Sequence, residues 1–425
     1  MVREFRPRRP YPSHPWGLRP QTPLPAPNGP CPQAPDGLDS RGRVGNHVPN
    51  YSAYMTPLPD CYCPVDGTRV PAGTLAWCCP LCRGPLDLDF APTPAPLKSL
   101  TGRANSLWRY AETLPLAAPT TTLGEGRTPL VELRDGVSAK LDFLMPTLSF
   151  KDRGAVLLAE LALRLKPDQV VADSSGNAGT AIAAYCARAR LPCTVYVPEG
   201  TSAKKLEQIG AHGARVRVID GDREAAAAAA REAADAPGTF YASHVYNPYF
   251  LHGTKTYVHE LWEDMGGRLP DVVVVPVGNG TLLLGAALAV AELHSAGLID
   301  RRPALYAVQS AAVAPLAHAW AEGASDLTGL AVPPVSPTLA EGIAIPDPPR
   351  ARQILRAVRD SGGTFLTVTE DQIRHAQRDL ASQGLYVEST GVACWAAVRE
   401  GALGTRTAVV PLCGAGLKTG LAAPA

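Results

Sequence analysis

A single lysine, Lys151, stands where an apolar, strand-like run meets an apolar helical pattern in the stretch "LMPTLSFKDRGAVLLAELALRL", residues 144–165. Of the eight lysines in the chain, it alone opens a helix whose next turns are apolar on nearly every face. Burial and a nearby helix N-terminus both favour the neutral amine over the ammonium ion. The sequence therefore predicts a buried, neutral and nucleophilic amine at this junction. The alternative is a lysine that keeps its charge in solvent at a helix end.

A glycine-rich loop, Gly278-Asn279-Gly280-Thr281, follows the apolar run "VVVVPV" and precedes the helical pattern "LLLGAALAV". A strand that leads through such a loop into a helix presents open backbone N–H groups, which bind anions. The glycine spacing differs from the G-x-G-x-x-G of dinucleotide sites, and the chain contains no G-x-x-x-x-G-K-[ST] motif for nucleoside triphosphates. The loop thus predicts a site for one phosphate group, and the alternative is a tight turn without a ligand.

A nucleophilic lysine beside a phosphate site is the combination that pyridoxal 5'-phosphate requires, because this cofactor forms a Schiff base with a lysine amine. We therefore predict an enzyme that carries pyridoxal phosphate on Lys151. The alternative is a non-catalytic binding protein, in which a basic tail and a cysteine ribbon serve a partner or nucleic acid. A chain that only binds has no need for a lone buried amine beside a phosphate loop, so the enzyme is favoured.

The elements that must position these residues alternate between strands and helices. The strand-like runs are apolar along their whole length, which predicts parallel sheets covered by helices on both faces. Ligands in such folds bind at the carboxyl ends of the strands. The predicted strands are 169–174, 193–198, 214–220, 271–277, 304–310, 363–369 and 407–412, and the predicted helices include 177–190, 203–213, 281–297 and 370–384.

The composition is that of an ordinary globular chain, since 46% of its 425 residues are hydrophobic and 19% are charged. The net charge of +1 gives no general reason to expect nucleic acid or an anionic membrane as partner. The sequence has no run long and apolar enough for a membrane span, and its first residues lack the apolar core of a secretory signal. We expect a cytoplasmic protein whose ten cysteines are thiols or metal ligands.

Seven segments occur in the order in which fold type II pyridoxal-phosphate enzymes carry them. The chain resembles this family over about residues 60–420, and within it is most similar to threonine synthase. The resemblance implies two doubly wound parallel-sheet α/β domains, as in the tryptophan synthase β fold, with the cofactor in the cleft between them. The small domain would be residues 155–250 and the large one residues 100–154 and 251–425, in a homodimer that acts on a small amino acid. The segments are "TLGEGRTPLVEL", "PTLSFKDRGA", "DSSGNAGTAIA", "VPVGNGTLLLG", "LAEGIAIPDPP", "GLYVESTGVA" and "VVPLCGAGLK".

The resemblance also implies roles for individual residues. Lys151 would form the Schiff base, and Asn177 would hydrogen-bond the phenolic oxygen of the cofactor. Cys413 would face the pyridine nitrogen, where a thiol does not hold the nitrogen protonated, and this suits elimination and replacement rather than transamination. The cofactor phosphate would lie on Gly278, Asn279, Gly280 and Thr281, and the substrate carboxylate on Ser174, Ser175, Gly176 and Ala178.

One segment departs from the family pattern at the substrate site. Threonine synthases carry a segment close to N-P-x-R-x-E-G-x-K-T, whose arginine helps to bind the phosphate of O-phosphohomoserine. Here residues 247–256 read "NPYFLHGTKT", so Phe250 replaces that arginine and His252 the glutamate, while Lys255 is kept and is predicted to bind substrate. The first prediction is threonine-synthase-like chemistry on O-phosphohomoserine or a related amino acid. The alternative is an ammonia-lyase that acts on unphosphorylated threonine, serine or a similar amino acid.

A cysteine cluster at residues 59–92 follows residues 1–58, whose many prolines and missing apolar periodicity predict a disordered tail. Threonine-synthase-like proteins often begin with a ribbon of two C-x2-C knuckles. The second knuckle is matched well, but the first has Asp66 at its second ligand position. We predict a structural zinc ion, with Asp66 as an alternative oxygen ligand and a metal-free ribbon as the alternative to zinc. The predicted ligands are Cys61, Cys63, Cys79 and Cys82.

Overall fold

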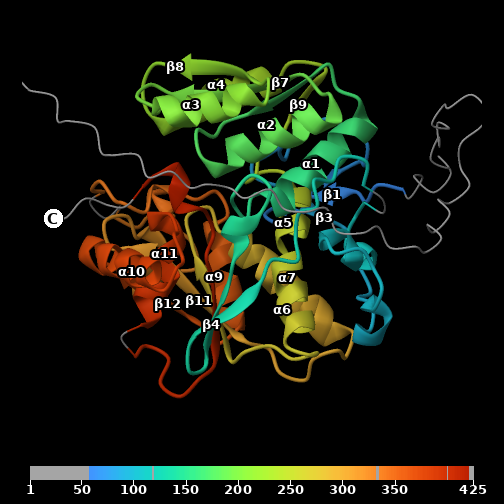
Figure 1. Cartoon of the computed structure of the whole chain (residues 1–425). Helices are drawn as coiled ribbons and strands as arrows, with labels where there is room; N and C mark the ends of the chain where they lie inside the picture. Colours follow the sequence, from blue (N-terminus) through green and yellow to red (C-terminus); the bar gives the residue numbers. More distant parts are fainter. Residues whose placement is uncertain (1–56, 117–118, 332–334, 400, 421–425) are drawn as a thin grey trace, which may run out of the picture. The chain divides into compact units, whose positions relative to one another are not determined.

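The computed structural model describes residues 57–116, 119–331, 335–399 and 401–420, all of which belong to one compact unit, Ser52–Ala425. The predicted disordered tail, residues 1–58, lies outside these residues except for its last two. The strands of the described part form three sheets (Figure 1). No helix in this part is both long and apolar enough to cross a membrane.

The largest sheet has six strands in the order β12-β11-β10-β13-β5-β4. Its neighbouring strands are parallel, except that β4 and β5 form an antiparallel pair. Every residue of β10 is buried, as expected for a valine-rich strand that is covered on both faces. The strands are β4 Leu130–Arg134, β5 Val137–Lys140, β10 Val272–Pro276, β11 Ala304–Ser310, β12 Thr364–Val368 and β13 Ala408–Pro411.

The second sheet has four parallel strands in the order β8-β7-β6-β9. In Figure 1 it lies in the upper, green part of the molecule together with helices α2, α3 and α4, whereas the six-stranded sheet lies in the lower part. Its strands are β6 Gln169–Ala172, β7 Cys193–Pro198, β8 Arg215–Ile219 and β9 Thr239–Tyr241.

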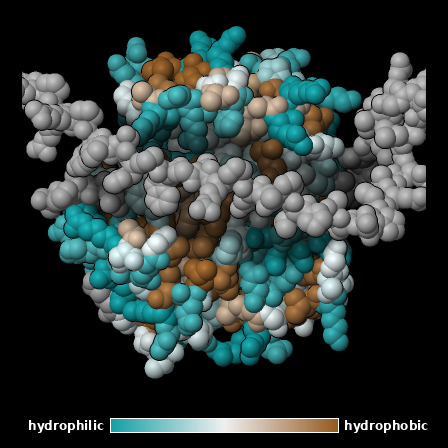
Figure 2. Space-filling model, viewed as in Figure 1, coloured by the Kyte–Doolittle hydropathy of each residue, from teal (hydrophilic) through white to brown (hydrophobic). Residues whose placement is uncertain are grey.

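Helix α1, Asp152–Leu165, is buried along its first eleven residues and packs against α2 and α5. It thus joins the two parts of the fold, because α2 follows β6 of the small sheet and α5 leads towards β10 of the large one. On the face shown in Figure 2 much of the hydrophobic surface lies near the centre, within a largely hydrophilic rim. The other helices are α2 Asn177–Ala189, α3 Ala203–Ala211, α4 Arg223–Ala234, α5 Pro248–Thr254, α6 Thr256–Asp264, α7 Thr281–Ser295, α8 Pro315–Ala321, α9 Ala351–Asp360, α10 Glu370–Ser382 and α11 Ser389–Val398.

The predicted α/β class with mainly parallel sheets is confirmed. All seven predicted strands are present, and the four predicted helices begin at their predicted residues. The sequence patterns missed β9 and the β4–β5 hairpin. Strand β9 has only three residues, too few for a recognisable pattern, and the hairpin turns at Gly136, whose φ is +75°.

The cysteine segment forms a small antiparallel sheet in the order β2-β1-β3. The buried Arg350 holds it to the body by donating to Asp87 Oδ1 at 2.8 Å and to the Leu86 carbonyl at 2.7 Å. Trp77 packs edge-on against Tyr241 of β9, with ring centroids 5.2 Å apart. The ribbon therefore packs against the four-stranded sheet. Its strands are β1 Cys61–Tyr62, β2 Arg69–Val70 and β3 Asp87–Leu88.

Candidate active site

A cavity of about 680 Å³ is lined by residues that follow strands of both parallel sheets. The loop after β6 contributes residues 173–178, and the loop after β10 contributes residues 278–282. Residues 388–390 and Cys413, which follows β13, complete much of the wall. The carboxyl ends of parallel strands are where α/β folds place their ligands. The cavity is therefore the candidate active site.

Lys151 lines this cavity and immediately precedes α1. Its Nζ lies 4.5 Å from the centroid of the Phe150 ring and 5.6 Å from that of Phe250. Desolvation by the surrounding protein lowers the pKa of Lys151 to about 7, and the charge of Arg223 acts in the same direction. A large fraction of this amine is therefore neutral near neutral pH, as nucleophilic or proton-accepting chemistry requires.

The close approach of α1 and α5 explains why Phe250 lies beside Lys151. A Cβ atom on Gly154 of α1 would lie 2.5 Å from the Phe250 ring, and one on Gly253 of α5 would lie 2.1 Å from the Arg153 carbonyl oxygen. Because these two glycines have no side chain, the backbone of α1 at Gly154 packs directly against the Phe250 ring, and the backbone of α5 at Gly253 packs directly against that of α1. Phe250 is fully buried there. The residue that replaces the family's arginine is therefore close to the predicted reactive amine.

The glycine loop before α7 has the features of a phosphate cradle. Gly280 has a φ of +71°, and a Cβ atom on Gly278 would lie 2.7 Å from Ile345 Cγ1 and 2.9 Å from Ile343 Cα. The loop therefore has no room for a side chain at position 278. It leads directly into the fifteen-residue helix α7, whose first N–H groups have no partner within the helix. Gly278, Asn279, Gly280 and Thr281 all line the cavity.

Asn177, the first residue of α2, lies between two charged side chains. Its Nδ2 donates to Glu388 Oε1 at 2.9 Å and Oε2 at 3.1 Å, and its Oδ1 accepts a hydrogen bond of 2.8 Å from Lys418 Nζ. Burial raises the pKa of the Glu388 carboxyl. The sequence reasoning assigned no role to Glu388, although a charged residue in the apolar segment "GLYVESTGVA" was a usable signal.

Cys413 also lines the cavity and is almost fully buried. Burial raises the pKa of its thiol, so the group is neutral at physiological pH. The carbonyl oxygen of Cys413 accepts a hydrogen bond of 3.0 Å from the Phe150 N–H, which fixes the β13 loop next to the segment that carries Lys151. The cavity thus presents an uncharged thiol close to the lysine.

The predicted substrate ligands fall into two groups. Ser174, Ser175, Gly176 and Ala178 line the cavity at the start of α2, but Lys255 does not. Lys255 Nζ donates to Glu292 Oε1 at 2.6 Å and lies 2.9 Å from His252 Nδ1, in a buried polar network between α5 and α7. Lys255 thus lies outside the cavity lining with its charge paired inside the helix packing, and its contact with the substrate stays a prediction.

Two cavity residues that the sequence reasoning did not single out are Arg223 and His244. Arg223 begins α4, and His244 follows β9. Neither stands in a motif that could be recognised in the sequence. They follow β8 and β9, the two outer strands of the four-stranded sheet, and both line the cavity at the carboxyl ends of these strands.

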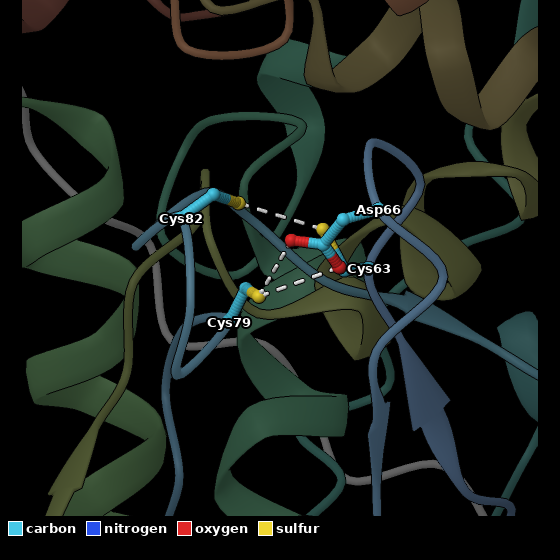
Figure 3. A group of neighbouring side chains, drawn as sticks. All are labelled: Cys63, Asp66, Cys79 and Cys82. Carbon is cyan, nitrogen blue, oxygen red and sulfur yellow. Dashed lines mark hydrogen bonds between the residues drawn. The ribbon is translucent and has the colours of Figure 1, made fainter.

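The ribbon brings four potential ligands together: Cys63, Asp66, Cys79 and Cys82 (Figure 3). Their ligand atoms all lie within 4.8 Å of one another. Three sulfur atoms and one carboxylate oxygen are a donor set that suits tetrahedral zinc. Cys61, which lies in strand β1, is not part of this group. The geometry thus favours Asp66 over the predicted Cys61 as the fourth ligand.

The residues of the cavity fit pyridoxal phosphate. The site offers an amine whose pKa is lowered to about 7, a loop that only glycine can form at the start of a long helix, and a neutral buried thiol. The amine could carry the cofactor aldehyde, the loop could hold its phosphate, and the thiol could lie at its ring. The cavity is therefore the candidate pyridoxal-phosphate site.

Sequence comparison agrees with this assignment. The family described as pyridoxal-phosphate dependent enzyme matches residues 121–414, so the chain belongs to that family. The threonine synthase of Methanosarcina acetivorans is 32% identical over 348 residues, covering 79% of this chain and 84% of that protein. The threonine synthase of Mycobacterium leprae is 34% identical over 297 residues, covering 67% of this chain and 79% of that protein. The chain is thus a threonine-synthase-like member of the family.

Solved structures show the same fold. The T.th. threonine deaminase is 28% identical with a TM-score of 0.59, covering 70% of this chain and 94% of that one. The L-serine ammonia-lyase of Rhizomucor miehei has a TM-score of 0.59 at 20% identity, covering 68% of this chain and 93% of that one. This second likeness shows the shared fold alone.

Proposed function

We propose that the chain is a carbon–oxygen lyase of the threonine synthase type, which removes an oxygen substituent from the side chain of a small amino acid. The observation that carries the proposal is the desolvated amine of Lys151 in a cavity with two N–H-rich loops. When bound, pyridoxal phosphate supplies an electron sink that stabilises negative charge at the substrate Cα.

The residues of the chain supply the remaining steps. The backbone N–H groups at the start of α2, with Ser174 and Ser175, orient the substrate carboxylate. Neutral Lys151 accepts the Cα proton, because its lowered pKa of about 7 keeps the amine available as a base. The buried thiol of Cys413 places no negative charge beside the cofactor ring. These roles suit loss of a leaving group more than transamination.

O-Phosphohomoserine, converted into threonine, is the first candidate substrate. The threonine synthases of Methanosarcina acetivorans and Mycobacterium leprae support it, because more than three quarters of each of those proteins is matched. The cavity also contains cationic residues beyond Lys151, among them Lys204, Arg223 and Lys418. A phosphorylated side chain is compatible with such a lining.

An ammonia-lyase that acts on threonine or serine is the second candidate. Phe250 favours it, because the buried phenyl ring beside Lys151 cannot form the bidentate contact of an arginine with phosphate. The likeness to the T.th. threonine deaminase is compatible with this reaction. The two candidates differ in the leaving group and in the fate of the amino group, so product analysis separates them.

Residues 155–250 are proposed to act as a small domain that closes on the rest of the chain over bound substrate. An ion pair spans the cavity, because Lys205 Nζ of α3 lies 2.7 Å from Glu341 Oε2 on the side of the six-stranded sheet. Closure would exclude water from a reactive carbanion. The expected homodimer and cytoplasmic location stay predictions.

The deciding experiment incubates the enzyme, loaded with pyridoxal phosphate, separately with O-phospho-L-homoserine, L-threonine and L-serine. Phosphate, threonine, ammonia and 2-oxo acid are measured in each reaction. Phosphate with threonine establishes the first candidate, and ammonia with 2-oxo acid from threonine or serine establishes the second. Inertness with all three would contradict both.

A further inference from the structure

The cysteine ribbon, residues 59–92, is attached to both parts of the fold. In Figure 1 the blue ribbon lies at the height where the upper part, with the four-stranded sheet, meets the lower part, with the six-stranded sheet. Residues 77–87 of the ribbon make polar contacts with each part, through different side chains. The ribbon therefore connects two parts that are proposed to move relative to each other when the cavity closes.

Trp77 and Arg83 attach the ribbon to the part with the four-stranded sheet. Trp77 Nε1 donates to Asp235 Oδ1 at 2.9 Å, and Arg83 Nη2 donates to Asp235 Oδ2 at 2.8 Å. The Trp77 ring is buried and packs edge-on against Tyr241 and Tyr246, with centroids 5.2 and 5.1 Å away. Asp235 is the C-terminal cap of α4, so this attachment ends on that helix.

Asp87 attaches the ribbon to the part with the six-stranded sheet. Its Oδ1 accepts a hydrogen bond of 2.8 Å from Arg350 Nη1, and its Oδ2 accepts one of 2.6 Å from Gln353 Nε2. Arg350 is buried, so the charged pair is shielded from solvent, which strengthens it. Gln353 lies on α9, which packs against α7 and against β11 of the large sheet.

The potential metal ligands lie between these two attachments. The second knuckle, Cys79–Cys82, lies in the sequence between the two residues that contact α4. The first knuckle, Cys63–Asp66, follows β1, which pairs with β3, the strand that carries Asp87. The ligand atoms of both knuckles lie within 4.8 Å of one another (Figure 3). One tetrahedral ion would thus connect the knuckle attached to α4 with the sheet attached to α9.

Both attachments end on elements that reach the cavity. Helix α4 has twelve residues, and Arg223 at its other end lines the cavity. Arg350 follows the segment whose residues 338–339 and 341–343 also line the cavity. Helices are stiff and can carry a displacement from one end to the other. The position of the ribbon is therefore coupled to two sides of the cavity wall.

We propose that the ribbon is a metal-responsive brace, which holds the two parts of the fold at the spacing where an amino acid fits the cavity. The brace rests on the proposed function, because it assumes that the small domain closes over an amino acid. Zinc in the ribbon then raises the affinity of the cavity for the amino acid. Because the two binding equilibria are linked, an amino acid in the cavity raises the affinity of the ribbon for zinc by the same factor.

The test measures both affinities on the full chain loaded with pyridoxal phosphate. The probe is L-2-aminobutyrate, which has the four-carbon skeleton of threonine but no oxygen substituent to eliminate. Its binding is followed by the visible spectrum of the zinc-loaded protein, of the protein stripped with a chelator, and of the stripped protein after zinc is restored. Zinc affinity is measured by competition with a chromophoric chelator, with and without saturating L-2-aminobutyrate.

Asp235→Ala is the main variant, because it removes the shared acceptor of the attachment to α4. The Asp235 side chain is 48% exposed and lies outside both the ligand group and the cavity lining. Gln353→Ala weakens the attachment to α9 in the same way. Glu232→Ala is the matched control, since it removes an exposed carboxylate from the last turn of α4.

Removal of zinc from the wild-type protein is expected to weaken L-2-aminobutyrate about fivefold or more, the lower end of measured couplings between sites. Restored zinc should reverse the loss, and saturating L-2-aminobutyrate should tighten zinc by the same factor. Asp235→Ala should bind the same amount of zinc, which shows that its ribbon is folded, but zinc should then change the amino-acid affinity less than about twofold. Gln353→Ala should reduce the zinc effect, and Glu232→Ala should leave it at the wild-type value.

Three results would overturn the brace and leave the proposed function intact. The first is equal affinity for L-2-aminobutyrate with and without zinc in the wild-type protein. The second is a full zinc effect in Asp235→Ala, which would show that the coupling does not pass through α4. The third is a wild-type protein that takes up no zinc. If the zinc-loaded protein binds no amino acid at all, the proposed function fails together with the brace.

Discussion

Lys418 Nζ donates a hydrogen bond of 2.8 Å to Asn177 Oδ1, joining the end of the described chain to the start of α2. Glu388 accepts both hydrogen bonds from the amide nitrogen of Asn177. The predicted contact of Asn177 with the phenolic oxygen of the cofactor therefore requires one of these partners to give way. The same geometry puts a second amine, that of Lys418, into the cavity of Lys151.

The two amines can be separated by mutation. Lys151→Ala is expected to abolish the visible absorbance of bound cofactor and the activity, because the same amine is proposed to hold the cofactor and to accept the Cα proton. Lys418→Ala should keep the absorbance, since Lys418 hydrogen-bonds Asn177 and is not proposed to hold the cofactor covalently. Absorbance spectra before and after borohydride, with peptide mapping of the labelled lysine, measure both.

The reverse pattern would contradict the assignment. If Lys151→Ala keeps the absorbance and Lys418→Ala loses it, Lys418 is the anchor. Lys255 is a suitable control, because its amine pairs with Glu292 away from the cavity lining and should never be labelled.

The rate of cofactor capture should depend on pH through Lys151. Only the neutral amine attacks an aldehyde, and desolvation lowers the pKa of Lys151 to about 7. The amine is protonated below this pKa and neutral above it. The second-order rate of pyridoxal phosphate uptake by the cofactor-free protein should thus rise about tenfold per pH unit below about pH 7 and level off above it.

Stopped-flow absorbance at several pH values gives this profile, with free Nα-acetyl-lysine as the reference amine. The reference should keep accelerating up to about pH 10, the range of an ordinary lysine. If the protein follows the reference rather than levelling off, Lys151 is not desolvated in the free enzyme.

Local patterns predicted most of the fold but only part of the site. Lys151 and the glycine loop could be found because each lies at a junction between strand and helix in one short stretch of chain. The pairing of Lys255 with Glu292 could not be predicted, because Glu292 lies on a different helix. Arg223 and His244 were missed because their shared place in the cavity lining depends on the arrangement of β8 and β9 in the sheet. Contacts of this kind depend on the topology of the fold and produce no recognisable spacing of residues in the sequence.

Phe250 should resist conversion to the arginine found in threonine synthases. It is fully buried, its ring lies against Gly154, and Lys151 Nζ is 5.6 Å from its centroid. A guanidinium here would stand beside another amine without a carboxylate partner. Phe250→Arg is expected to lower the free energy of unfolding by about 3 kcal/mol or more, the scale of an uncompensated buried charge.

Urea unfolding measures this change, with Phe250→Met as the uncharged control. Methionine fills the site with an adaptable apolar chain, so its cost should stay below about 1.5 kcal/mol. Equal midpoints for the arginine and methionine variants would show that the arginine reaches an anion or solvent through the cavity. The local environment would then be more polar than the structure indicates.

The ribbon is expected to bind about one zinc ion per chain, through Cys63, Asp66, Cys79 and Cys82. Cys79→Ser and Asp66→Ala should lose the metal and lower the melting temperature, because metal binding contributes to the folding energy of such small units. Cys61→Ser is the matched control, since Cys61 lies in the same ribbon but outside the ligand group. Metal analysis of the purified variants and their thermal unfolding curves provide the measurements.

Loss of zinc should also affect the active site, because the ribbon is attached next to the loop that carries His244. Arg350 donates to Leu86 of the ribbon at 2.7 Å and to the Val245 carbonyl at 2.7 Å, directly after His244. A ribbon without its metal would therefore hold the His244 loop less firmly. The proportional loss of substrate affinity should exceed the proportional loss of visible absorbance from the bound cofactor. Zinc loss in Cys61→Ser but not in Asp66→Ala would instead assign the fourth ligand to Cys61. A metal-free wild-type protein of full stability would show that packing alone holds the ribbon.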